Sequence, residues 1–263
     1  MRIATWCIDG VCGRLEVLCH WLKRREPDVV ALQKIRVSEE KFPAKALASV
    51  AYRSEPLRTE SSYGVALLAR NDLPKFEILD RGLPGGDRPD DRFLTARIGD
   101  LVVSSVYAPF GNPAVRGRDG AIKYKVAWLD RLIAHLEERR VDAGRSLLCG
   151  DFNVLPDVPA KPGVPNCTQD EKERLQTILK TGFQDLYDLY RRLHRPSAAG
   201  RNHGFNPRLP HTSRLQLTLG TESVAAVTAS VRVDLEYRAA VDELPGRTWP
   251  ASAPMIVDLA DPA

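Results

Sequence analysis

The chain has 263 residues, of which 43% are hydrophobic and 27% charged, with a formal net charge of +4 at pH 7. These values are typical of a soluble globular protein that can bury a sizeable core, and the mildly basic charge is compatible with a phosphate-rich partner without demonstrating one. Because no apolar run reaches 18 residues and the chain starts directly with a predicted strand, neither a membrane span nor a signal peptide is expected.

The first elements expected along the chain are a strand, an amphipathic helix and a second strand. The strand is predicted over Arg2–Cys7 and ends at the Asp9-Gly10 turn. Apolar residues at i, i+3, i+4 and i+7 between Leu15 and Leu22 then predict a helix. Pro27 ends that helix, and residues 28–33 (DVVALQ) are predicted to form a buried strand.

Strands and helices continue to alternate in the middle of the chain. Two strands, Phe93–Ile98 and Leu101–Tyr107, are predicted to form a hairpin. A second helical stripe lies between Val126 and Leu136, and Thr168 with Glu171 forms a capping box that predicts the start of another helix. This pattern predicts helices outside two mixed sheets, in a single domain that spans residues 1–263.

The segment at residues 145–154, RSLLCGDFNV, combines a buried strand with two polar side chains at its end. Gly150 interrupts the apolar run, and Asp151 and Asn153 are predicted to lie on one face of an extended segment. A carboxylate beside an amide can position a nucleophilic water or a phosphate, or hold a hard cation. The structural alternative is an Asx turn that ends the strand.

The cysteines are odd in number and include no CxxC pair. This favours free thiols in a reducing cytoplasm over a disulfide framework or a zinc site. The five are Cys7, Cys12, Cys19, Cys149 and Cys167.

Six motifs in one order resemble the exonuclease III/abasic-site (AP) endonuclease family of the endonuclease–exonuclease–phosphatase superfamily. They are TWCIDG at 5–10, WLKRREPDVVALQ at 21–33, GVALLAR at 64–70, VYAP at 106–109, KYKVAWLDRL at 123–132 and LLCGDFNV at 147–154. The resemblance covers most of residues 1–190. It implies a four-layer α/β sandwich, in which helices flank two mixed sheets.

The resemblance also implies a chemistry, Mg²⁺-dependent cleavage of phosphodiesters in DNA repair. Family positions that keep their polar residue are Asp9, Tyr107, Asp151 and Asn153. Family positions with a different residue are Cys7, Lys34, Phe110, Gln216, Ala251 and Ser252. Lys34 stands where the family has its principal metal-binding Glu, and Ala251 and Ser252 stand where it has the Asp–His pair that acts on the attacking water.

Lys34 suggests how such a site persists without a bound metal, which we do not expect here. The hypothesis is that its ammonium occupies the former metal position and pairs with Asp151, with Asp9 as a further candidate partner. A cluster of carboxylates without a cation would suffer like-charge repulsion, which one lysine relieves. The alternative is a Lys34 that extends into solvent.

The sequence therefore predicts a catalytically inactive homologue with a nucleic-acid-binding or regulatory role and DNA or RNA as partner. Candidate phosphate contacts are Arg36, Arg92, Lys123 and Lys125, although for any single one of them a solvated surface charge is the favoured interpretation. One alternative is an active Mg²⁺-dependent exodeoxyribonuclease III/AP endonuclease of base-excision repair that uses substitute ligands. Another is a scaffold that binds a protein partner.

Overall fold

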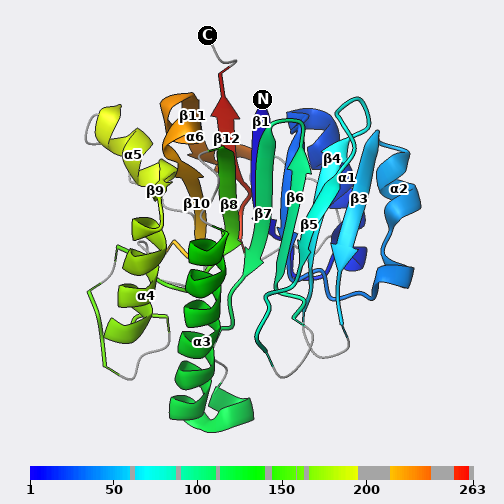
Figure 1. Cartoon of the computed structure of the whole chain (residues 1–263). Helices are drawn as coiled ribbons and strands as arrows, with labels where there is room; N and C mark the ends of the chain where they lie inside the picture. The colour runs from blue at the N-terminus through cyan, green and yellow to red at the C-terminus, as the bar shows by residue number, and fades with distance from the viewer. Residues whose placement is uncertain are drawn as a thin grey trace.

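The computed structural model describes residues 1–59, 63–86, 90–110, 113–139, 144–157, 159–162, 166–194, 214–237 and 252–260. Within these residues, two six-stranded mixed sheets pack face to face, and helices cover their outer faces (Figure 1). The predicted α/β sandwich is confirmed. No helix in the described part of the chain is both long enough and apolar enough to cross a membrane.

The first sheet has the strand order β11-β12-β1-β2-β4-β3. Its strands are β1 (Arg2–Cys7), β2 (Val29–Gln33), β3 (Tyr52–Leu57), β4 (Val65–Arg70), β11 (Thr228–Val233) and β12 (Met255–Leu259). β1 is parallel to β2 and antiparallel to β12, so both ends of the chain meet in this sheet. The helical segments between these strands are η1 (Cys12–Arg14), α1 (Leu15–Arg25), η2 (Glu39–Lys41) and α2 (Ala44–Ala48).

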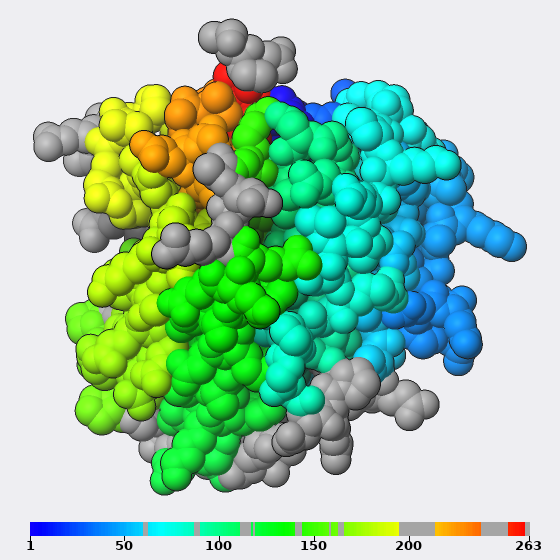
Figure 2. Space-filling view, viewed as in Figure 1, coloured from blue at the N-terminus to red at the C-terminus, as the bar shows by residue number. Residues whose placement is uncertain are grey.

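The second sheet has the strand order β5-β6-β7-β8-β10-β9. Its strands are β5 (Glu77–Arg81), β6 (Phe93–Ile98), β7 (Leu101–Tyr107), β8 (Arg145–Asp151), β9 (Phe183–Asp185) and β10 (Gln216–Thr221). The helices of this half are α3 (Pro113–Glu138), α4 (Gln169–Lys180), α5 (Leu186–Leu193) and α6 (Glu222–Ala226). α3 and α4 lie side by side and form much of one surface of the molecule (Figures 1 and 2).

Three apolar clusters hold these layers together. One lies between the sheets and includes Ala31 of β2 and Val103 of β7. A second packs Trp21 of α1 against the first sheet, and a third packs Trp128 of α3 against the second sheet. The predicted capping box at the start of α4 is present, because the Thr168 side chain accepts from the backbone of Glu171 and the Glu171 side chain accepts in return.

Two pairs of parallel strands end at the same edge of the molecule. β1 and β2 finish with Cys7 opposite Gln33, and β7 and β8 finish with Tyr107 opposite Asp151. The two pairs also contact each other across the sheets. The carboxyl ends of parallel strands in open α/β sheets are common places for ligand sites, and the polar residues of the sequence motifs gather there.

Candidate functional site

Side chains from β10 and from the segment before β12 form hydrogen bonds with the backbone at the end of β1. The Gln216 side chain accepts a hydrogen bond from the Cys7 backbone N–H at 3.1 Å and donates one to the Ala253 carbonyl at 3.1 Å. The Ser252 hydroxyl donates to the Cys7 carbonyl at 2.9 Å. Three of the substituted family positions therefore lie together. Ala251 lies outside the described residues.

Asp151 is the buried carboxylate at the centre of the site. Its side chain accepts the backbone N–H of Asn153 at 3.0 Å, which is the Asx turn considered as the structural alternative. Burial raises the pKa of the Asp151 carboxyl, while the Lys34 ammonium, the Asn153 N–H and the Cys7 thiol act to lower it. Asp151 therefore interacts with several of the chain's own donors.

Asn153 does not continue the strand. β8 ends at Asp151, and Asn153 adopts a left-handed backbone with φ of 51°. Its side-chain amide donates to the Ala108 carbonyl at 2.8 Å. The prediction that Asp151 and Asn153 share one face of an extended segment is therefore wrong, because the backbone turns between them. Asn153 instead joins the segments that follow β7 and β8.

Lys34 lies close to aromatic rings. Its Nζ is 5.6 Å from the ring centroid of Tyr107 and 6.0 Å from that of Tyr63. Within the described residues Lys34 forms no ion pair at 4.0 Å or less, so the expected direct ion pair with Asp151 is wrong. The ammonium nevertheless acts on Asp151 through space and opposes the rise that burial causes in the pKa of that carboxyl.

Asp9 is paired with arginines. Its carboxylate lies 2.7 Å from Arg36 and 4.0 Å from Arg14. The further ion pair expected between Lys34 and Asp9 is therefore also absent from this part of the structure. Arg36, a candidate phosphate contact, remains exposed and lies over the Tyr63 ring at 5.1 Å.

Cationic and aromatic side chains contact one another beside the site in what we call the cation–aromatic row. It consists of Arg36, Tyr63, Lys34, Tyr107 and Arg92. The two rings meet edge to face with centroids 6.0 Å apart, and the last guanidinium lies 4.9 Å from its ring. Such contacts are attractive and hold cations near the surface without neutralising them. The sequence reasoning missed the ring at position 63, whose only signal is an aromatic residue directly before Gly64.

Lys125 is not a surface contact. Its side chain is fully buried, with Nζ 2.8 Å from a Glu171 carboxylate oxygen and 3.0 Å from the Asn166 side-chain oxygen, and it also donates to the Asn153 carbonyl. Burial lowers the pKa of Lys125, and Glu171 opposes that shift. The prediction of a phosphate contact here is wrong, because this lysine supports the loop after β8. Lys123, two residues earlier, is exposed.

The residues present do not fit a magnesium ion. Mg²⁺ requires oxygen ligands in near-octahedral geometry, whereas Cys7 offers a thiol whose pKa is raised by burial and by Asp151. Asp9 is bound to Arg36, and the Lys34 ammonium acts through space on the buried Asp151 carboxyl, whose pKa burial raises. Within the described residues, no group of three or more His, Cys, Asp or Glu side chains is placed to hold a metal.

Comparison with known proteins assigns the family. Residues 8–250 match the model of the endonuclease/exonuclease/phosphatase family. The chain belongs to this family. Within it, the relatives and the motifs make it an exonuclease III/AP endonuclease-like protein.

Two curated relatives have related sequences. Exodeoxyribonuclease III of Haemophilus influenzae is 27% identical over 161 residues, which are 59% of this chain and 58% of that protein. The DNA repair nuclease APEX1 of Danio rerio is 26% identical over 203 residues, which are 72% of this chain and 63% of that protein. The chain thus covers less than two thirds of the length of either relative.

Two solved structures share the fold nearly end to end. An AP endonuclease from Archaeoglobus fulgidus superimposes with a TM-score of 0.81 at 23% identity, covering 99% of this chain and 100% of that one. A 3′ phosphatase from Neisseria, bound to a product DNA hairpin, gives a TM-score of 0.80 at 25% identity, covering 99% of both chains. A protein of this fold therefore binds DNA.

Proposed function

We propose that this chain is an exonuclease III-like protein that binds nucleic acid through its cation–aromatic row and does not cleave it by a magnesium-dependent reaction. The observation that carries the proposal is the Lys34 ammonium, which lies 6.0 Å and 5.6 Å from the ring centroids of Tyr63 and Tyr107 and acts on the buried Asp151 carboxyl. The resemblance implies a metal-binding Glu at that position. A cation there disfavours a metal and favours a phosphate.

The surface around Lys34 supports single-stranded nucleic acid as the ligand. Arg36 and Arg92 provide guanidinium groups for phosphates, and Tyr63 and Phe110 are 41% and 47% exposed. Proteins that bind single strands combine cationic grooves with aromatic side chains on which bases stack. Phe110 replaces a family Asn, so this exchange substitutes a stacking surface for a polar group.

The side chains at the substituted positions support the absence of cleavage. Gln216 and Ser252 do not ionise at neutral pH, and both are engaged with the Cys7 backbone. A positioned acid–base group contributes about 10²–10⁴-fold to a reaction rate. Neither of these two residues can supply that contribution by exchanging a proton at neutral pH.

Two assays on the intact chain test the proposal. The first incubates an abasic-site duplex and a 3′-recessed duplex with Mg²⁺, Mn²⁺ or EDTA, with Asp151→Ala as control for contaminating nuclease. The second measures binding of fluorescent single-stranded DNA and RNA across a salt series. We expect no metal-dependent cleavage and an affinity that falls as salt rises.

Lys34→Ala tests most directly whether the cation–aromatic row binds nucleic acid. We expect it to weaken binding at low salt about 10-fold and to reduce the slope of log affinity against log salt by about 0.7, the value for one phosphate contact on a single strand. Lys180→Ala, at an exposed lysine on α4, is the matched control and should change neither value.

Two outcomes contradict the proposal. Metal-dependent cleavage that Asp151→Ala abolishes would identify a working enzyme with substitute ligands. Absence of binding to both DNA and RNA at low salt would reject the nucleic-acid role and favour a protein-binding scaffold.

A further inference from the structure

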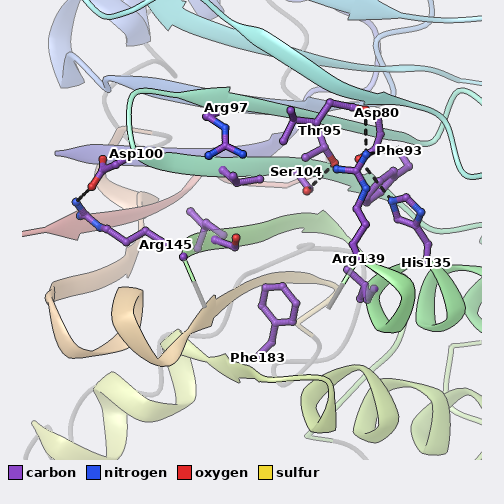
Figure 3. A pocket seen from close by; sticks show the side chains of 16 residues that line it. Asp80, Phe93, Thr95, Arg97, Asp100, Ser104, His135, Arg139, Arg145 and Phe183 are labelled. Carbon is purple, nitrogen blue, oxygen red and sulfur yellow. Dashed lines mark hydrogen bonds and ion pairs between the residues drawn. The ribbon is translucent and has the colours of Figure 1, made fainter. Parts of the chain in front are cut away.

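A cavity of about 330 Å³ lies on the outer face of the second sheet, beside α3, whereas the candidate functional site lies at the edge where β7 and β8 end. Val102 and Ser104 in the first half of β7 line it, whereas Tyr107 at the end of the same strand belongs to the cation–aromatic row. β6, the C-terminal half of α3 and the start of β8 supply further walls (Figure 3). The two sites are therefore separate.

The sheet face that lines the cavity carries hydroxyl groups. Thr95, Ser104 and Ser146 all lie on it and are buried, and the first two are hydrogen-bonded to each other at 2.8 Å. Elsewhere on this face, Val106 and Leu148 belong to the apolar cluster that packs against α3. The face is thus polar where the cavity lies and apolar where the helix covers it.

Three polar atoms that line the cavity accept or donate no hydrogen bond within the described residues, although their side chains take part in ion pairs. Asp80 Oδ2, His135 Nε2 and Arg145 Nε are buried and form no hydrogen bond. Asp80 and His135 lie 3.5 Å apart at these atoms, which is too far for a good hydrogen bond. Unsatisfied buried groups are rare in native proteins, and a ligand or water usually explains them.

Arginines are found at both ends of the cavity (Figure 3). At one end, Arg139 is paired with the largely buried Asp80 at 2.7 Å. At the other, Arg145 is paired with Asp100 at 2.7 Å, but the Asp100 side chain is 70% exposed. An exposed ion pair contributes little, so a ligand anion can replace Asp100 at small cost.

We propose that this cavity binds a small organic anion. Its apolar or aromatic body lies against Phe93, Leu136 and Phe183, and its carboxylate or phosphate is held by Arg97 and Arg145. Guanidinium and hydroxyl donors outnumber the carboxylate acceptors of the lining, which selects a ligand rich in acceptor oxygens. The volume is at the lower end of the range for small-molecule sites and excludes an oligonucleotide.

Calorimetric titration of the whole chain with three probes tests this site. Benzoate and phenyl phosphate carry the same aromatic body on different anions, and inorganic phosphate carries the anion alone. We expect at least one aromatic anion to bind, with inorganic phosphate at least 10-fold weaker. Whichever of benzoate and phenyl phosphate binds more tightly identifies the anionic group that the cavity prefers.

Two variants locate the binding. Arg145→Gln removes the positive charge at the rim of the cavity and should lower the affinity for the aromatic anion at least 10-fold. Val102→Trp places a ring in the cavity from a half-buried position and should abolish binding. Arg174→Gln is the matched control, since this arginine is likewise paired with an exposed carboxylate, that of Asp130, and should leave the affinity unchanged.

Thermal unfolding confirms that each variant is folded before titration. Absence of binding by both aromatic anions at millimolar concentration overturns the proposal, as does binding that Arg145→Gln and Val102→Trp leave intact. The nucleic-acid assays on Val102→Trp should match the parent chain, so failure at this cavity and failure of the proposed function are distinguishable.

Discussion

Lys125 and Lys123 lie two residues apart on α3, yet their surroundings differ completely. The first is fully buried in an ion pair with Glu171, and the second is exposed. Both belong to the motif KYKVAWLDRL, where both were interpreted as candidate phosphate contacts. The face of a helix that a residue occupies decides whether its charge meets solvent or a carboxylate in the core.

Lys125→Met should therefore lower the free energy of unfolding by about 3–5 kcal/mol, because it leaves the Glu171 carboxylate buried without its cation. Chemical denaturation at pH 7 measures this change. Lys123→Met is the matched control, and its free energy of unfolding should stay within about 0.5 kcal/mol of that of the parent chain. The double variant with Glu171→Gln should recover much of the loss, since it removes the isolated charge and keeps an acceptor for the capping box, and an equal loss in single and double variants would contradict this account.

The cation–aromatic row also belongs to the residue scale. Lys34 and Arg36 both have left-handed backbones, with φ of 56° in each. β2 ends just before them at Gln33, and Lys34 reaches the rings of Tyr63 and Tyr107 from this segment. Neither the conformation nor the rings follow from the LQKIR motif.

At the scale of the elements, the backbones of β7 and β8 pack closely at Gly150. This glycine has φ of 150°, and a side-chain carbon there would overlap the backbone carbonyl of Val106. The parallel pairing that ends at Tyr107 and Asp151 therefore requires a residue without a side chain.

Gly150→Ala should lower the free energy of unfolding by more than about 2 kcal/mol, because a backbone group rather than a flexible side chain blocks the added methyl. Gly13→Ala is the control, since a carbon added at Gly13 would meet no atom within 4 Å. Denaturation curves of the two variants give the comparison. Equal free energies of unfolding for the two variants would contradict this account, because they would show that β7 and β8 can move apart to accept the methyl group without loss of stability.

At the scale of the whole molecule, Asp258 joins the two ends of the chain. It lies on β12 and accepts hydrogen bonds from Arg2 on β1 and from Ser230 and Arg232 on β11. Burial acts to raise the pKa of its carboxyl, but these donors outweigh burial and lower the pKa to about 2. The first sheet is thereby linked across three strands.

Asp258→Asn should reduce stability at pH 7, and the difference should shrink as the pH falls. Because the pKa is lower in the folded chain than its unfolded value of about 3.9, the charged carboxylate stabilises the fold above that value. The contribution is lost as the pH falls through about 2. Urea denaturation from pH 7 to pH 2 measures this, with Asp130→Asn as control, and a difference that is independent of pH would contradict it.

Local features of the sequence determined much of the architecture. β1, β6 and β7 match their predicted bounds, and the Thr168 capping box opens α4 as expected. These elements depend on periodicity and on side chains a few residues apart, both of which are visible in the sequence.

Only the tertiary structure decided the arrangement of the site and the cavity. The burial of Lys125, the turn at Asn153 and the ring of Tyr63 beside Lys34 depend on contacts between residues 28 to 45 positions apart in the sequence. The cavity with Arg145 likewise joins β5, β6, β7, β8 and α3. Side chains from distant segments set these surroundings, and no local pattern specifies which segments will meet.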